Sequence, residues 1–256
     1  MRGKLVAGAI SIMIGTAAHA EPVTDGQLTA ATLRLITHIA TDAFDAAPSA
    51  DFSGRTFVIE IPVAEFAYDT FKCQPYWTYA RDAGVLKVSV QQGLASTYMM
   101  RRGPGAALTG AADQAYQFRP FVCSNAPVTR SKGVNGFGAA VDIQHHQTTV
   151  IGLSKPYRRE TLTWSRVVTP DEGRALAGAL RVRMSGTVGT WGAGGSIGCV
   201  RDHTDATFSS PIEDDTTMCV VRVADLRTDL IDSRTGEVLA TELPTDADPP
   251  KGKKRR

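Results

Sequence analysis

Beyond its first 20 residues, the chain has no apolar run long enough to cross a bilayer, which takes about 18 or more consecutive apolar residues. The apolar stretch at residues 5–14 is shorter than this, and it follows the positive charges of Arg2 and Lys4. Small residues at positions 18 and 20 then fit the cleavage rule of a secretory signal peptide. We therefore expect residues 1–20 to be removed and the mature protein to be periplasmic or secreted, not an integral membrane protein.

The chain also has little cysteine, and none of its four cysteines forms a C-x-x-C pair or has a histidine at zinc-finger spacing. This spacing argues against a structural zinc site. In an exported protein the four cysteines are instead expected to form disulfides, for which three pairings exist. We expect the pairings that keep each bond within one half of the chain, Cys73–Cys123 and Cys199–Cys219.

Nucleotide-binding motifs are missing as well. The glycine-rich run at residues 189–198 has no lysine for a G-x-x-x-x-G-K-[ST] phosphate loop, and Ile197 stands where G-x-G-x-x-G needs its third glycine. The chain has 28 basic and 26 acidic residues, and without the signal peptide and residues 251–256 it has 21 against 26. This mildly acidic body lacks the basic excess of a nucleic-acid binder, so we expect no nucleic-acid partner. Because the nucleotide-binding motifs are missing, we also expect no cofactor.

The glycine-rich run does contain G-x-S-x-G around Ser196, the spelling of the nucleophile elbow of serine hydrolases. An elbow needs a helix directly after the serine, whereas residues 197–202 have no helical pattern. The single downstream histidine, His203, is preceded only by its neighbour Asp202, which cannot orient the ring in a triad. We interpret the run as a glycine-rich turn between two strands.

Other candidate residues carry weaker signals. His145 and His146 are adjacent, so on a strand they face opposite sides and cannot share one metal ion. Acidic residues cluster around His203 between Cys199 and Cys219 without the spacing of a calcium loop, and we interpret them as a solvated acidic loop. Aromatic residues that could contact a sugar or a peptide, with core packing as the simpler interpretation, are Tyr76, Trp77, Tyr79 and Trp191.

Two helices are predicted. One should run from about residue 27 to residue 46, with Asp25 as its cap and Leu33 on its buried stripe. The other should occupy about residues 170–180, because Thr169, Pro170 and Glu172 form a capping box with proline in the first turn.

Alternating apolar residues predict strands through most of the remaining chain. They indicate a strand at 55–63, a strand pair within 137–153 and hairpins that turn at 81–84 and 232–236. Residues 101–136 are rich in turn-forming types, which predicts long loops. Because helices and strands do not alternate regularly, we expect an α+β, β-rich fold, an antiparallel sandwich or open barrel with helices packed on it.

We expect residues 21–243 to form one β-rich domain, with two lobes at about 51–130 and 137–243 as the alternative. Residues 244–256, PTDADPPKGKKRR, should be a disordered basic tail that makes at most weak electrostatic contact with anionic surfaces.

Together these features favour a non-enzymatic, exported, bacterial-type envelope protein that binds an unknown envelope protein or glycan. One alternative is a secreted hydrolase that uses Ser196 or a site centred on His203. Another is a structural subunit of an envelope assembly, whose strand edges pair with neighbouring subunits.

Overall fold

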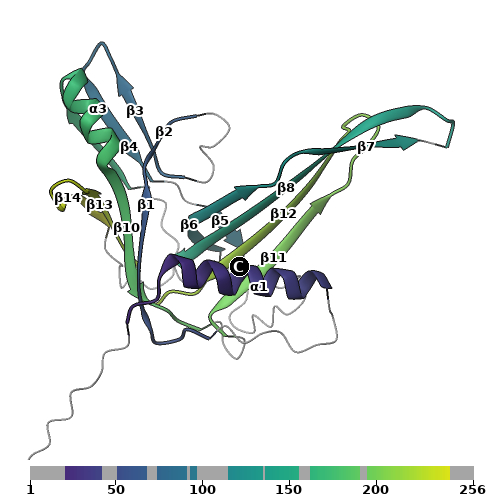
Figure 1. The fold of residues 1–256 in the computed structure, drawn as a ribbon, viewed down its shortest axis with the longest axis horizontal. Coiled ribbons are helices and arrows are strands. Elements are labelled where there is room, and N and C mark those ends of the chain that lie inside the picture. The colour runs from purple at the N-terminus through teal and green to yellow at the C-terminus, as the bar shows by residue number, and fades with distance from the viewer. Residues whose placement is uncertain are drawn as a thin grey trace, which may run out of the picture.

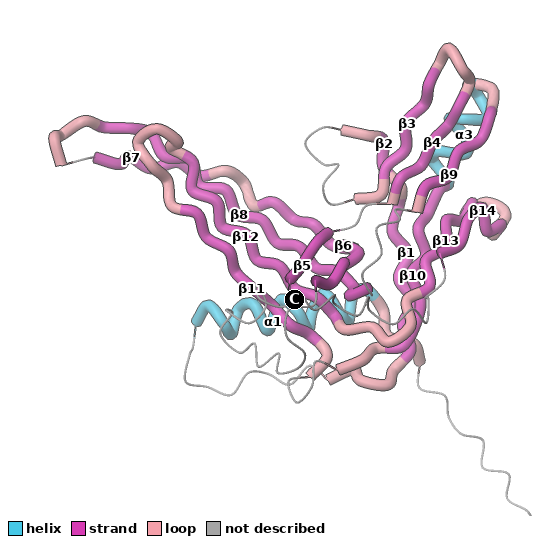
Figure 2. The backbone as a smooth tube through the Cα atoms, turned by 180° about the vertical axis from the view of Figure 1, so that it is seen from behind, coloured by secondary structure: helices cyan, strands magenta, loops and turns pink. Residues whose placement is uncertain are grey.

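The computed structural model describes residues 21–41, 51–67, 74–90, 93–96, 115–134, 136–155, 162–190 and 195–242. In these residues two helices and mostly antiparallel strands form an α+β, β-rich fold, as the sequence predicts. The strands make two limbs that diverge from a common base, and helix α1 (Asp25–Thr41) crosses the lower part of one limb (Figure 1, Figure 2). Neither described helix is long and apolar enough to span a membrane.

Helix α1 begins one residue earlier than a cap at Asp25 would allow. The hydroxyl of Thr24 accepts the N–H of Gln27 at 3.3 Å, and the side-chain oxygen of Gln27 accepts the N–H of Thr24 at 3.1 Å. This reciprocal pair is a capping box, so Thr24 and not Asp25 caps the helix. Residues 42–46 of the predicted helix lie outside the described part of the chain.

The buried side of α1 differs in part from the predicted stripe, although Leu35 and Ile36 do pack against the core. Leu28 and Thr32 are fully buried, whereas Leu33 is 47% exposed, so the placement of Leu33 on the buried stripe is wrong. The hydroxyl of Thr32 donates to the carbonyl of Leu28 at 2.7 Å. This bond satisfies the polar group of Thr32 within the helix and lets it face the core.

The first sheet has four antiparallel strands in the order β1–β10–β13–β14. Alternation places Phe57 and Ile59 in the core from one side of β1, as predicted. The predicted last hairpin, which turns at 232–236, is also confirmed, with Gly236 at a φ of 74°. The bounds of these strands are β1 Thr56–Pro62, β10 Leu180–Thr187, β13 Arg227–Asp232 and β14 Glu237–Glu242.

The second sheet has six strands in the order β11–β12–β8–β6–β5, with β7 also beside β8. Strand β12 is parallel to β8, whereas the other pairs are antiparallel. The bounds are β5 Gly93–Ser96, β6 Ala115–Asn125, β7 Thr129–Val134, β8 Ala140–Lys155, β11 Ile197–Thr204 and β12 Ile212–Val221.

Two predictions fail in this sheet. Strand β8 is one continuous strand of 16 residues, so the prediction of a strand pair within 137–153 is wrong. The prediction of loops throughout 101–136 is wrong for β6 and β7, which pair in succession with β8. A pattern of alternation cannot distinguish one long strand from two, because both have the same period. Residues 101–114 lie outside the described part of the chain.

The third sheet has the order β2–β3–β4–β9, with bounds β2 Ala64–Glu65, β3 Tyr76–Ala80, β4 Val85–Ser89 and β9 Thr163–Val167. The predicted hairpin between β3 and β4 is confirmed, and Gly84 closes its turn at a φ of 60°. Helix α3 (Pro170–Ala179) is also confirmed. Thr169 and Glu172 make the predicted capping box at its N-terminus.

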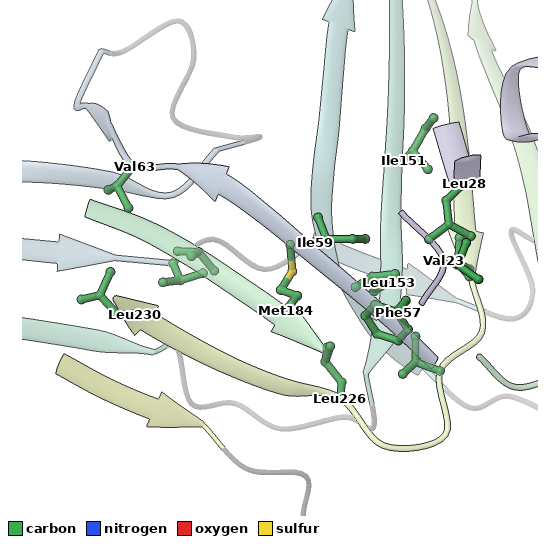
Figure 3. Close-up of a cluster of buried hydrophobic side chains, with 14 of the residues drawn as sticks. Val23, Leu28, Phe57, Ile59, Val63, Ile151, Leu153, Met184, Leu226 and Leu230 are labelled. Carbon is green, nitrogen blue, oxygen red and sulfur yellow. The ribbon is translucent and has the colours of Figure 1, made fainter. Parts of the chain in front are cut away.

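One cluster of buried apolar side chains includes members from α1 and all three sheets. Figure 3 shows part of it, where Leu28 of α1, Ile59 of β1 and Leu153 of β8 lie in the same region. In the same region β10 lies close to the segment that precedes β13. A Cβ atom on Gly186 of β10 would lie 1.9 Å from the carbonyl oxygen of Asp225. The division of residues 21–243 into one domain or two lobes stays a prediction.

Candidate functional site

One end of the second sheet projects from the core as an arm, which we define as residues 128–134, 136–147 and 203–215. It consists of β7, the outer half of β8 and the outer ends of β11 and β12, and both views show it extending beyond the rest of the protein (Figure 1, Figure 2). Every described side chain of the arm is exposed or half-buried, and on β8 full burial begins only at Val150. Both faces of this single sheet layer therefore reach solvent.

The arm is rich in exposed apolar side chains. It carries five of the ten large apolar residues that are exposed in the described part of the chain. Phe137, in the β7–β8 turn, is 99% exposed, and Phe208, in the β11–β12 loop, is 57% exposed. Large exposed apolar groups that gather in one region mark interaction sites more often than scattered ones do. The five residues are Val128, Val134, Phe137, Phe208 and Ile212.

The arm also holds every histidine whose side chain is described, and each is paired with a carboxylate. His145 Nδ1 lies 3.1 Å from Glu213 Oε2. His146 Nδ1 lies 3.4 Å from Asp214 Oδ1. The third pair joins His203 Nε2 and Asp205 Oδ1 at 3.0 Å.

Strand register explains why the first two pairs lie on opposite faces. His145 is directly opposite Glu213 in the parallel β8–β12 pair, and His146 is directly opposite Asp214. Neighbouring residues of a strand point to opposite sides, so each histidine meets its own acid. The prediction that the two histidines face opposite sides agrees with this register.

A third residue extends the His145 pair. The hydroxyl of Ser131 on β7 lies 2.7 Å from His145 Nε2. Ser131 is two residues along β7 from Thr129, the residue opposite His145, so it shares the His145 face. The three strands thus bring Ser131, His145 and Glu213 into one line of contacts. We call the face that carries them the relay face.

Ser196 lies far from this line, inside the base of the protein. Its side chain is fully buried, and its hydroxyl oxygen accepts the backbone N–H of Phe52 at 2.8 Å. The hydroxyl donates to Asp51 Oδ1 at 3.4 Å. Hydrogen bonds from Ser53, with a smaller one from Ser196, lower the pKa of Asp51 below its ordinary value. In these contacts Ser196 holds the segment at 51–53 against the start of β11.

His203 is exposed on the arm, and four of the acidic residues near it lie in strands, not in the predicted loop. They were expected in a solvated loop, but Asp202, Glu213, Asp214 and Asp215 belong to strands β11 and β12. Acidic residues do not predict these strands, because Asp, and to a lesser degree Glu, is depleted in strands. Among the described residues, no group of three or more His, Cys, Asp or Glu side chains is placed to hold a metal ion.

The predicted aromatic contacts belong to the third sheet. Trp77 and Tyr79 are half-buried and pack against the main core. The hydroxyl of Tyr79 donates to the carbonyl of Val168 at 3.3 Å. Tyr76 faces the other way and meets Phe66, with ring centroids 5.0 Å apart. Trp191 lies outside the described residues.

The predicted disulfide Cys199–Cys219 is confirmed, with an S–S distance of 2.00 Å. It joins residues directly opposite each other on β11 and β12. Cys123 on β6 is also disulfide-bonded. Cys73 lies outside the described residues, and its pairing with Cys123 stays a prediction.

No known protein family matches the chain, and no curated protein or solved structure does.

Proposed function

We propose that this protein is an exported interaction module of a cell envelope and that it binds a partner protein through the arm. The observation that carries the proposal is the gathering of exposed Phe, Val and Ile side chains on a sheet end that projects from the core.

The position of these side chains supports binding over a role in folding. Phe137 and Phe208 lie in the turns that end the two hairpins, where they contribute little to the buried core. Ile212 and Val134 share the face opposite the relay face, since both are in register with the even-numbered residues of β8. Aromatic residues are enriched at the centres of protein interfaces, and aliphatic neighbours complete such patches.

A partner protein fits this patch better than a glycan. Sugar sites combine aromatic faces with convergent polar groups in a concavity, whereas the two phenylalanines of this patch lie exposed in turns. The disulfide Cys199–Cys219 is compatible with the oxidising compartment that export would supply. The proposal requires no cofactor and no nucleic acid, and the expected contact of residues 251–256 with anionic surfaces is not part of it.

Two other functions stay open as alternatives. A hydrolase centred on Ser196 would need that buried hydroxyl to leave the N–H of Phe52, and one centred on His203 would rely on the pair with Asp205. A structural subunit would use strand edges such as β7 and β11, which lie at the sides of the arm.

Site-specific photocrosslinking in the producing cell tests the proposal. A photoreactive residue replaces Phe137, and a control replaces Val167, which is 76% exposed on β9 of the other limb. We expect an adduct with one defined protein at position 137 and not at position 167. An adduct with a second copy of the chain would favour the structural subunit instead. No adduct at position 137, or the same adducts at both positions, would contradict the proposal.

A further inference from the structure

The relay face holds a serine, a histidine and a glutamate in one series of contacts: a hydrogen bond joins Ser131 to Nε2 of His145, and an ion-pair contact joins Nδ1 to Glu213. We propose that Ser131 is an activated nucleophile that reacts with carboxylic esters, with His145 as its general base and Glu213 as the residue that orients the base. This inference is independent of the proposed binding function, because it concerns the other face of the arm and has a separate chemical readout.

The chemistry of the two contacting groups assigns the proton on the imidazole. An ionised carboxylate can only accept, so the favoured tautomer has its proton on Nδ1 of His145, 3.1 Å from Glu213 Oε2. In the neutral ring the other nitrogen, Nε2, then carries a lone pair. It accepts the hydroxyl proton of Ser131 across 2.7 Å. This is the tautomer that a histidine base needs to activate a serine.

The sheet holds all three side chains in place through its register. Glu213 on β12 is directly opposite His145 of β8. Ser131 on β7 is the diagonal neighbour of His145 across the other edge of β8. Cross-strand neighbours of this kind lie within reach of each other without any loop to position them. Each of the three side chains is also partly solvent-exposed, so a substrate can approach the hydroxyl from above the face.

The surroundings of Ser131 indicate the class of ester. Ile143 is directly opposite Ser131, and Val141 lies two residues further out on the same face. The side chain of Ile143 covers Gly133, where a Cβ atom would lie 2.7 Å from its Cδ1. These groups offer apolar contact to a short acyl chain. The open face suits esters carried on a large molecule, such as an O-acylated glycan.

The reaction balances with water as the second substrate. Ser131 Oγ bonds to the carbonyl carbon while its proton moves to His145 Nε2, and the bond to the alcohol oxygen breaks as that oxygen takes the proton. Water then attacks the acyl-serine and gives its proton to Nε2. The carboxylic acid leaves, and Ser131 recovers its proton from the ring. The net reaction converts ester and water to acid and alcohol.

A fluorophosphonate probe tests the nucleophile, with the labelled peptide identified by mass spectrometry and p-nitrophenyl butyrate hydrolysis as a second readout. We expect the label on the peptide that contains Ser131, and its loss in Ser131→Ala. His145→Gln should slow labelling at least about 100-fold, and Glu213→Gln should slow it less, because a positioned base contributes on the order of 100-fold or more.

The pair on the opposite face supplies matched controls. His146→Gln and Asp214→Asn remove the same chemical groups from neighbouring positions of the same strands, and both should leave labelling unchanged. Circular dichroism should show that all the variants keep the fold of the parent. A folded protein without label at Ser131 would overturn the inference. Equal labelling of the parent and His145→Gln would overturn it too, because the hydroxyl would then not depend on the base.

Discussion

The guanidinium of Arg119 on β6 lies 2.8 Å from the carboxylate of Glu242 on β14, and this ion pair joins the second sheet to the first. Arg119 is 1% exposed, and its Nε and Nη1 atoms have no hydrogen-bond partner within the described part of the chain. Burial lowers the pKa of Arg119 to about 10. Burial therefore disfavours the cation on balance, and Glu242 supplies its counter-charge.

Removal of the carboxylate should destabilise the protein more than removal of both charges. Glu242→Gln leaves the Arg119 cation buried without a counter-charge and should lower the free energy of unfolding by about 3 kcal/mol or more. In Arg119→Met combined with Glu242→Gln, no buried charge remains, and most of this loss should be recovered. Urea unfolding of the single and double variants measures the difference.

A half-exposed pair provides the control for that comparison. Arg183 on β10 and Glu60 on β1 are in contact at 2.6 Å, with about two-fifths of each side chain exposed. Glu60→Gln should cost no more than about 1 kcal/mol, because solvent screens exposed ion pairs. If Glu242→Gln costs no more than Glu60→Gln, the role of Arg119 as a buried charge is contradicted.

Ser196→Ala should reduce stability. The substitution removes the acceptor of the Phe52 N–H bond, and loss of a partner for such a group costs about 1–3 kcal/mol. Thermal unfolding measures the change, with Ser165→Ala, at an exposed serine on β9, as a control that should stay within about 0.5 kcal/mol of the parent. If the Ser196→Ala protein is as stable as the parent, the proposed role of Ser196 as a hydrogen-bond partner that stabilises the fold is contradicted.

The pair of Asp232 and Arg234 should make stability depend on pH in the acid range. Side-chain hydrogen bonds from Arg234 lower the pKa of Asp232 below its ordinary value. A carboxylate with a lowered pKa in the folded state contributes stability above its unfolded pKa, about 3.9, and this contribution is lost as the pH falls further.

Asp232→Asn tests this dependence. The difference in unfolding free energy between the parent and Asp232→Asn should be largest at pH 5–7 and should shrink below about pH 4, where the unfolded Asp is protonated as well. Arg234→Met should give the same pattern by removing the partner. A difference that is constant from pH 7 to pH 3 would contradict the assigned role of the carboxylate.

Local sequence patterns predict the elements whose determinants lie within a few residues. The alternation around Phe57 and Ile59 predicts β1, and Thr169 with Glu172 predicts the start of α3. Gly84 and Gly236 mark hairpin turns, because a positive φ is least costly for glycine. These signals need no information from elsewhere in the chain.

The candidate site depends on contacts between distant segments, and local patterns cannot predict it. Glu213 meets His145 because β12 lies parallel to β8, and nothing in either strand specifies the other as its neighbour. Ser131 falls in a segment whose Gly and Pro content favours loops. The adjacent histidines at 145 and 146 were visible in the sequence, but their partners follow only from strand register.

Crosslinking from the arm in two backgrounds tests the proposed binding function most directly. A photoreactive residue at Val134, which is 67% exposed, is compared in the parent and in Phe137→Ser combined with Phe208→Ser. Both phenylalanines are exposed, so the fold should be retained. If the arm binds through its apolar side chains, the yield of the partner adduct should fall at least about 10-fold, as expected for the loss of interface anchors. An unchanged yield would contradict the proposal that these side chains form the binding surface.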